Sequence, residues 1–156
     1  MVKVINLISL INEENDNLNQ IEPGELFEQN SVSELQMHKI LYILFGLFYK
    51  KFNKDLFSQA NFEAWKQGPV EIDFRRSLEI NKEANLDKFN IALNDEELIF
   101  IKKLIRKFLI CYSPWSLVEI TQASDAWMNN YDGKNNNHNK IAVEEIRRNF
   151  NFVVYE

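Results

Sequence analysis

The chain has 156 residues, a formal net charge of −5 at pH 7 and 46% hydrophobic residues. This length predicts a single domain over residues 1–156, with a core large enough to fold without disulfides or metals. The acidic balance disfavours nucleic acid as a partner, because contacts to phosphates need a locally positive surface. A single cysteine excludes an internal disulfide, so the sequence favours a reducing, cytoplasmic compartment. The longest apolar run, residues 40–49, is too short to span a bilayer, so we expect no membrane association.

The first third of the chain predicts two helices. Residues 2–11 carry apolar side chains at helical spacing, whereas the polar residues 12–30 are typical of a loop with at most a short turn. Ser31 and Glu34 have the spacing of a capping box at the start of the next helix. That helix, predicted over residues 33–51, is apolar on nearly all sides, so we expect it in the centre of the core.

A short strand is predicted over residues 62–66, where a strand-like run with a tryptophan precedes Gly68 and Pro69. Proline suits the first position of a helix, because the N–H that it lacks would have no intrahelical partner there. The sequence therefore predicts that a helix starts at Gly68-Pro69. Its apolar face would carry three residues spaced by four: Val70, Phe74 and Leu78.

The second half of the chain begins with a predicted helix over residues 94–112. Asn94, with Glu97 three residues further on, has the pattern of a capping box for a helix that reaches residue 112. Ser113 and Pro114 then combine a capping residue with a proline at the first helical position. We therefore expect a second, short helix directly after the first.

The last part of the chain predicts a helical turn around Trp127, an Asn-rich loop over residues 129–140 and a final helix over residues 141–150. Residues 151–156 have the composition of a short strand. Together the elements predict a mainly α, compact single-domain fold of about six helices, with at most a short strand or hairpin.

No residue pattern predicts a catalytic or metal site. Of the two histidines, His38 is expected on the flank of a core helix and His138 in solvent, within the Asn-rich loop. Cys111 has no obvious base beside it, and we expect it to be buried and inert. We therefore predict a protein that is not an enzyme and holds no cofactor and no metal. Paired carboxylates are expected to be solvated: Glu13-Glu14, Glu96-Glu97 and Glu144-Glu145.

Four basic residues gather on one side of the helix predicted over residues 94–112, opposite its apolar stripe: Lys102, Lys103, Arg106 and Lys107. Such a group is most often a solvated face, and this is the interpretation that we favour. Two alternatives stay open, which are contact with an acidic protein partner and contact with a phosphate backbone. No aromatic residues interleave with the four, as a platform for stacking bases would need.

Three segments stand out as a pattern: MHKILYILFGLF at residues 37–48, NKDLF at 53–57 and FEAWKQGPV at 62–70. The pattern resembles the Panacea domain family, also described as SocA-like antitoxins or the phage-associated GepA type. That family reads L-Q-K-L-L-Y, then G-K-P-L-F, then F-x-A-W-x-x-G-P-V and later T-H-x-x-x-x-W. The chain departs from it with His38 in place of Gln and Gln122 in place of His. The family-motif positions are Lys39, Leu41, Tyr42, Phe62, Ala64, Trp65, Gly68, Pro69, Val70 and Trp127.

The resemblance covers residues 33–150 and implies a mainly α-helical antitoxin that neutralises a cognate toxin by direct protein–protein binding. Members of the family are often encoded in two-gene operons or on mobile elements. An alternative is a phage- or mobile-element-associated adaptor or scaffold that binds a host protein, for example to deliver it to a protease. Residues 1–30 lie outside the resemblance and are expected to form the N-terminal helix and loop.

The Gly-Pro corner is interpreted mainly as scaffold. Trp65 is expected to pack in the core, since large aromatic side chains dominate core packing. Lys66 and Gln67 follow it and are expected at the surface, where they are candidate contacts for a protein partner. The basic residues of the later helix complete the candidate partner-binding set: Lys102, Lys103, Arg106 and Lys107.

Overall fold

The computed structural model describes residues 2–21, 31–80, 91–133 and 138–148. Within these ranges the chain forms seven helices and three short strands, which confirms the mainly α fold class. None of the described helices is both long enough and apolar enough to cross a membrane. The elements, in chain order, are α1 (Val4–Ile21), α2 (Glu34–Phe52), β1 (Phe62–Trp65), β2 (Gly68–Glu71), α3 (Ile72–Ile80), α4 (Asp95–Cys111), α5 (Pro114–Gln122), α6 (Asp125–Asn130), β3 (Asn139–Ile141) and α7 (Val143–Arg148).

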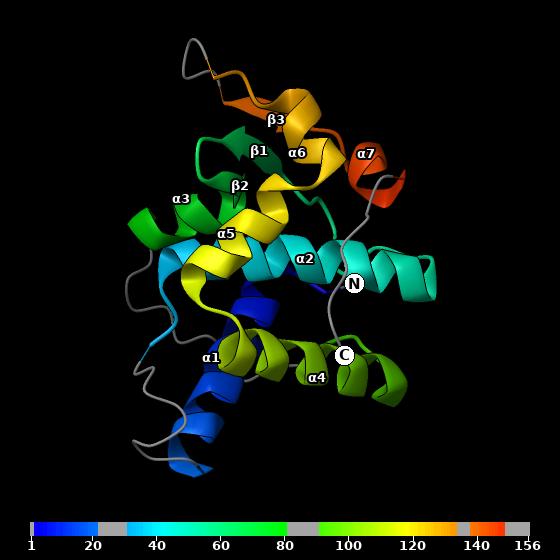
Figure 1. Ribbon diagram of the computed structural model, residues 1–156. Helices are drawn as coiled ribbons and strands as arrows, with labels where there is room; N and C mark the ends of the chain where they lie inside the picture. The colour runs from blue at the N-terminus through cyan, green and yellow to red at the C-terminus, as the bar shows by residue number, and fades with distance from the viewer. Residues whose placement is uncertain (1, 22–30, 81–90, 134–137, 149–156) are drawn as a thin grey trace.

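Helix α2 is the central element of the fold. It lies between α4 on one side and the strand β2 with α5 on the other, and α1 packs against α4 (Figure 1). Its residues from Gln36 to Gly46 are all buried, as expected of a helix that is apolar nearly all round. The capping box is formed by Ser33 with Gln36, so the prediction that it starts at Ser31 was wrong by two residues.

The three strands form one antiparallel sheet in the order β2-β1-β3. Phe62 pairs with Glu71 on one side and with Ile141 on the other, which fixes the register. The prediction that Gly68-Pro69 starts a helix was wrong, because both residues belong to β2. Pro69 is tolerated there because β2 is an edge strand, where a missing N–H breaks no ladder bond. The helix α3 begins only after the strand, at Ile72.

Helix α1 is longer than the sequence predicted. The expected loop over residues 12–30 is helical as far as Ile21, and residues 22–30 lie outside the described ranges. Polar residues hid this extension, because two of them are buried rather than solvated. Glu14 is 1% exposed and Asn15 is 2% exposed, and α1 packs here against α4. The ion pair of Glu14 with Arg106 explains how a carboxylate is accommodated at this contact.

The second half follows the predictions more closely. Asn94 forms the expected capping box with Glu97, and Ser113 with Pro114 starts α5 as predicted. Trp127 lies in the short helix α6. The last helix is described only over Val143–Arg148, and the strand β3 occupies part of the loop predicted over residues 129–140. The strand predicted over residues 151–156 lies outside the described ranges.

Candidate functional site

The hairpin of β1 and β2 closes with a two-residue turn, Lys66 and Gln67, between the paired residues Trp65 and Gly68. Gly68 has φ +108°, a conformation that favours glycine. A Cβ atom there would lie 2.8 Å from Oγ1 of Thr121 and 2.9 Å from Cε of Lys39. Both the backbone and the space therefore require glycine at this corner.

Three hydrogen bonds hold this hairpin end in place. Nε2 of Gln122 donates to the carbonyl oxygen of Lys66 over 2.9 Å, and Nε1 of Trp127 donates to that of Trp65 over 2.8 Å. The ammonium of Lys39 donates to the carbonyl oxygen of Pro69 over 2.9 Å. The donors come from α5, α6 and α2, so three helices fix the backbone of one exposed turn.

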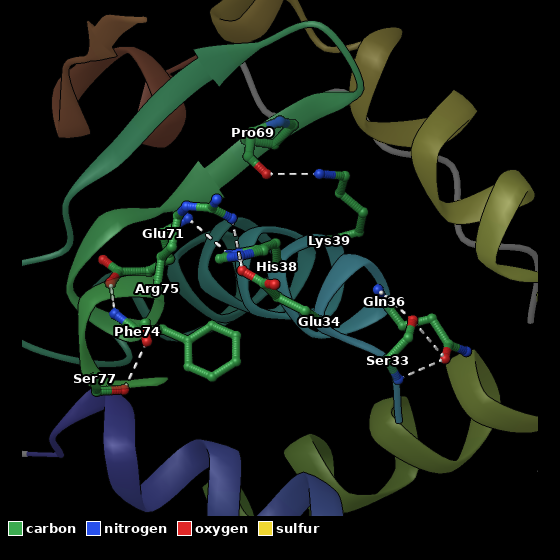
Figure 2. Close-up of polar contacts among 10 residues, drawn as sticks. All are labelled: Ser33, Glu34, Gln36, His38, Lys39, Pro69, Glu71, Phe74, Arg75 and Ser77. Carbon is green, nitrogen blue, oxygen red and sulfur yellow. Dashed lines mark hydrogen bonds and ion pairs between the residues drawn. The ribbon is translucent and has the colours of Figure 1, made fainter. Parts of the chain in front are cut away.

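A cleft of about 410 Å³ lies between the first turns of α2, the end of the hairpin and α3. Its wall includes the apolar side chains of Leu35 and Val70 and the indole of Trp65. The charged side chains in its lining are Glu34, Lys39, Lys66 and Arg75. Figure 2 shows Lys39 leaving α2 toward Pro69, with Glu34, His38 and Arg75 gathered beside it.

His38 connects α2 to the hairpin by a buried hydrogen bond. Its Nδ1 accepts the backbone N–H of Glu71 over 3.0 Å, so its proton is on Nε2, which lies 3.2 Å from a carboxylate oxygen of Glu34. The same carboxylate accepts from the guanidinium of Arg75 over 2.9 Å (Figure 2). Burial lowers the pKa of His38 to about 4, so the ring is neutral at pH 7. The expected flank histidine is therefore a buried, hydrogen-bonded connector.

Glu71 ends β2 and begins α3. Its two carboxylate oxygens accept the backbone N–H groups of Asn61 and Phe74, over 2.8 Å and 2.9 Å. The side chain is fully buried, and burial raises its pKa above the ordinary value for glutamate. Glu71 therefore supplies the N-terminal cap of α3, the helix that carries Arg75.

Trp65 lies at the cleft and is only partly buried, which corrects the expectation that it packs in the core. The ring of His138 stacks on it, with 3.7 Å between centroids and 10° between planes. The guanidinium carbon of Arg75 lies 4.9 Å from the indole centroid, a cation–π distance. His138 is exposed, as predicted, but it is also held against Trp65 rather than free in solvent.

Residues 37–128 match the family model described as "Antitoxin SocA-like, Panacea domain". The chain belongs to this family. No curated protein and no solved structure matches the chain. The family match confirms the resemblance drawn from the sequence motifs. It includes His38, Lys39 and the cleft residues of the hairpin and α3, whereas Glu34 and Leu35 lie just before it. Among the parts of this SocA-like domain that the structure describes, no group of three or more His, Cys, Asp or Glu residues could hold a metal ion.

The motif positions of the Panacea domain divide between core and cleft. Leu41, Tyr42, Phe62 and Ala64 are fully buried, and the hydroxyl of Tyr42 lies 2.8 Å from that of Ser124. Burial raises the pKa of Tyr42 to about 12, so the phenol stays neutral. Val70 and Trp127 are also buried, and the remaining motif positions form the hairpin and its support: Lys39, Trp65, Gly68 and Pro69.

The structure does not bring the two predicted groups of partner contacts together. Lys66 and Gln67 are exposed and line the cleft, whereas the basic residues lie on α4, on the far side of α2 (Figure 1). Two of the four basic residues already contact a carboxylate of the same chain, on α1. Arg106 lies 2.6 Å and Lys102 lies 3.8 Å from the carboxylate of Glu14. Lys103 is exposed and Lys107 is partly exposed.

Three expectations about the burial of residues outside the cleft were wrong. Glu14 and Glu97, expected in solvent, are buried, at 1% and 2% exposure. Glu97 closes the capping box and pairs with Lys54 over 2.5 Å, which also lowers its pKa against the opposing effect of burial. Cys111, expected in the core, is exposed at the end of α4, because the stripe of apolar residues facing the core ends before it.

The sequence pointed to Lys66 and Gln67 as contacts and to Lys39 only as a family-motif position, and it missed Glu34 and Arg75. Glu34, Lys39 and Arg75 meet at the cleft from two different helices. A signal for one of them existed, because Lys39 is the only charged residue between positions 37 and 48 of a helix predicted to be buried. A charge in such a run needs a local partner or a function.

Proposed function

We propose that this protein is an antitoxin-type binding module that neutralises a cognate toxin by direct protein–protein contact. The observation that carries the proposal is its membership of the SocA-like antitoxin family over residues 37–128. Neutralisation by contact requires a stable surface and no turnover, so we infer a non-enzymatic protein. The single thiol and the family's role favour action in the cytoplasm.

The face around the turn of Lys66 and Gln67 is the part of the molecule that best suits this role. Its backbone is held by hydrogen bonds from three helices, so little conformational entropy would be lost when a partner binds. A partly exposed tryptophan and an arginine stand beside the turn, and both residue types are favoured at binding hot spots. We therefore place the partner contact at the cleft and its turn.

The basic face of α4 supports the proposal less well. A cation that already contacts a buried carboxylate binds a partner's carboxylate less strongly, because the two carboxylates compete for the same cation. This applies to Arg106 and Lys102, which both contact Glu14. Lys103 makes no ion pair with a described residue and is the matched control for charge changes at Lys66.

A growth-rescue experiment tests the proposal. The product of the adjacent open reading frame is expressed from an inducible promoter, alone and together with this chain, and any complex is recovered by affinity pull-down. Toxicity alone, rescue together and a stable complex are the expected results. Toxicity that this chain leaves unchanged would contradict the proposal. The level of the toxin during rescue separates inhibition from delivery to a protease, since only delivery lowers it.

A further inference from the structure

The floor of the cleft is formed by a buried ammonium group with unused hydrogen-bonding capacity. Lys39 is 1% exposed, and its Nζ donates to one acceptor, the carbonyl oxygen of Pro69. An ammonium has three N–H donors. Among the described residues no further acceptor lies within hydrogen-bonding distance of this group, so two donors are left over. A buried charge with so few partners is costly and calls for a ligand.

The surroundings of Lys39 give the cleft a charge opposite to that of the whole chain. Three cations and one carboxylate line it, and these four side chains sum to +2, whereas the chain carries −5. The carboxylate, Glu34, is already held by Arg75 and by His38. Glu34 acts on Lys39 only through its charge, and no carboxylate among the described residues forms a salt bridge with Lys39. The cleft is thus suited to an incoming anion.

The size and lining of the cleft favour a carboxylate on a short aliphatic stem. Leu35, Val70 and Trp65 offer apolar surface for methylene groups above the ammonium. Two spare donors on one nitrogen match the two oxygens of a carboxylate. A phosphate, with three oxygens to satisfy, is usually bound by several backbone N–H groups or by an arginine fork. Here Nη1 of Arg75 already donates to Glu34, so the guanidinium is turned toward that carboxylate.

We propose that the cleft binds the side-chain carboxylate of an aspartate or glutamate from the protein partner, with Lys39 as its ion-pair partner. This inference rests on the proposed function, since it assigns the chemistry of the contact that the partner makes. Burial lowers the pKa of Lys39 to about 8, so the group is still mostly protonated at pH 7 and available for such a pair. The ion pair would be enclosed by the hairpin turn and therefore shielded from salt more than a surface pair is.

The experiment uses the full chain and a pair of small probes of nearly equal shape. N-acetyl-glutamate α-amide and N-acetyl-glutamine α-amide are titrated into the ¹⁵N-labelled protein, and the amide signal of Gly68 and the indole signal of Trp65 are followed. A third titration uses N-acetyl-phosphoserine α-amide. The indole signal is assigned with the variant Trp65→Phe. The same titrations are repeated on Lys39→Met and on the control Lys103→Met.

The expected result is a saturable shift of both signals with the glutamate probe, at least about tenfold weaker binding of the glutamine probe, and no change in Lys103→Met. Lys39→Met should lose the preference for glutamate, a loss of about tenfold to a hundredfold in affinity, as expected for one charge-assisted hydrogen-bonded pair. Equal binding of the two probes, tighter binding of the phosphoserine probe, or an unchanged preference in Lys39→Met would overturn the inference.

These outcomes are independent of the growth rescue. Rescue by the wild type with no glutamate preference in the cleft would leave the antitoxin role standing and reject the carboxylate site. A cleft that prefers glutamate, in a chain that protects cells from no neighbouring toxin, would support the carboxylate site and reject the antitoxin role. The comparison of the two probes on the wild-type protein also needs no variant, so the test holds even if Lys39→Met folds poorly.

Discussion

Replacing Lys39 with methionine should leave the protein at least as stable as the wild type, although the residue is fully buried. Burial moves the pKa of Lys39 from 10.5 in the unfolded chain to about 8 in the fold. At 1.36 kcal/mol for each pKa unit, holding this charge in the folded protein costs about 3 kcal/mol at pH 7. The methionine removes that cost.

The variant also loses one favourable contact. The carbonyl oxygen of Pro69 loses its hydrogen bond from Lys39, a loss of about 1–3 kcal/mol when the acceptor is left buried and unpaired. The two effects nearly balance, so Lys39→Met should be between about 0 and 2 kcal/mol more stable at pH 7. A buried lysine kept only for the fold would behave differently, because its removal would destabilise the protein.

The pH dependence of stability separates the effect of the Lys39 charge from the other effects of the substitution. Between pH 8 and 10.5 the unfolded chain binds more protons at this residue than the folded protein does, so stability rises with pH in this window. We expect the wild type to gain about 2 kcal/mol relative to Lys39→Met between pH 7 and pH 9.5, measured by urea denaturation. A difference that stays constant with pH, or a variant destabilised by more than about 2 kcal/mol at pH 7, would refute the reasoning.

Three further predictions concern the hairpin and α4. The pKa of His38 falls from 6.5 to about 4 on folding, so stability should drop by about 2 kcal/mol from pH 7 to pH 5 by urea denaturation, and the variant His38→Gln should lack that drop. Gly68→Ala should destabilise by about 2–4 kcal/mol, because a Cβ is both strained at φ +108° and crowded; a loss below about 1 kcal/mol in thermal or chemical unfolding would speak against this. Arg106→Ala should lose about 1–3 kcal/mol in the same assays, because the buried Glu14 would keep only its longer contact with Lys102. Lys103→Ala should stay within about 0.5 kcal/mol, and equal effects of the two substitutions would contradict the ion-pair argument.

Much of the helical framework was predictable because local physics determines it. The apolar residues of α2 leave it no solvent-facing side, and the capping residues Asn94 and Ser113 mark where α4 and α5 start. The extension of α1 was not predictable, because Glu14 and Asn15 look like surface residues until α4 supplies Arg106 from 92 positions away. Local sequence cannot show a partner at that distance.

The site was predictable only in part, for the same reason. The surface position of Lys66 and Gln67 was predicted correctly, whereas the hairpin turn that they form was not. The meeting of Glu34 with Arg75, 41 positions later, depends on how α3 leaves the hairpin. The path of α3 could not be predicted, because the Gly68-Pro69 pair has the pattern of a helix start but lies in an edge strand.

The most direct test of the account is the affinity of the purified chain for its toxin after charge reversal at two exposed lysines. Lys66→Glu changes the turn at the cleft, and Lys103→Glu makes the same change on α4. We predict that Lys66→Glu weakens the complex at least about tenfold by isothermal titration calorimetry, while Lys103→Glu leaves the affinity within about twofold. Weakening by Lys103→Glu alone would contradict it and would place the toxin on the basic face of α4.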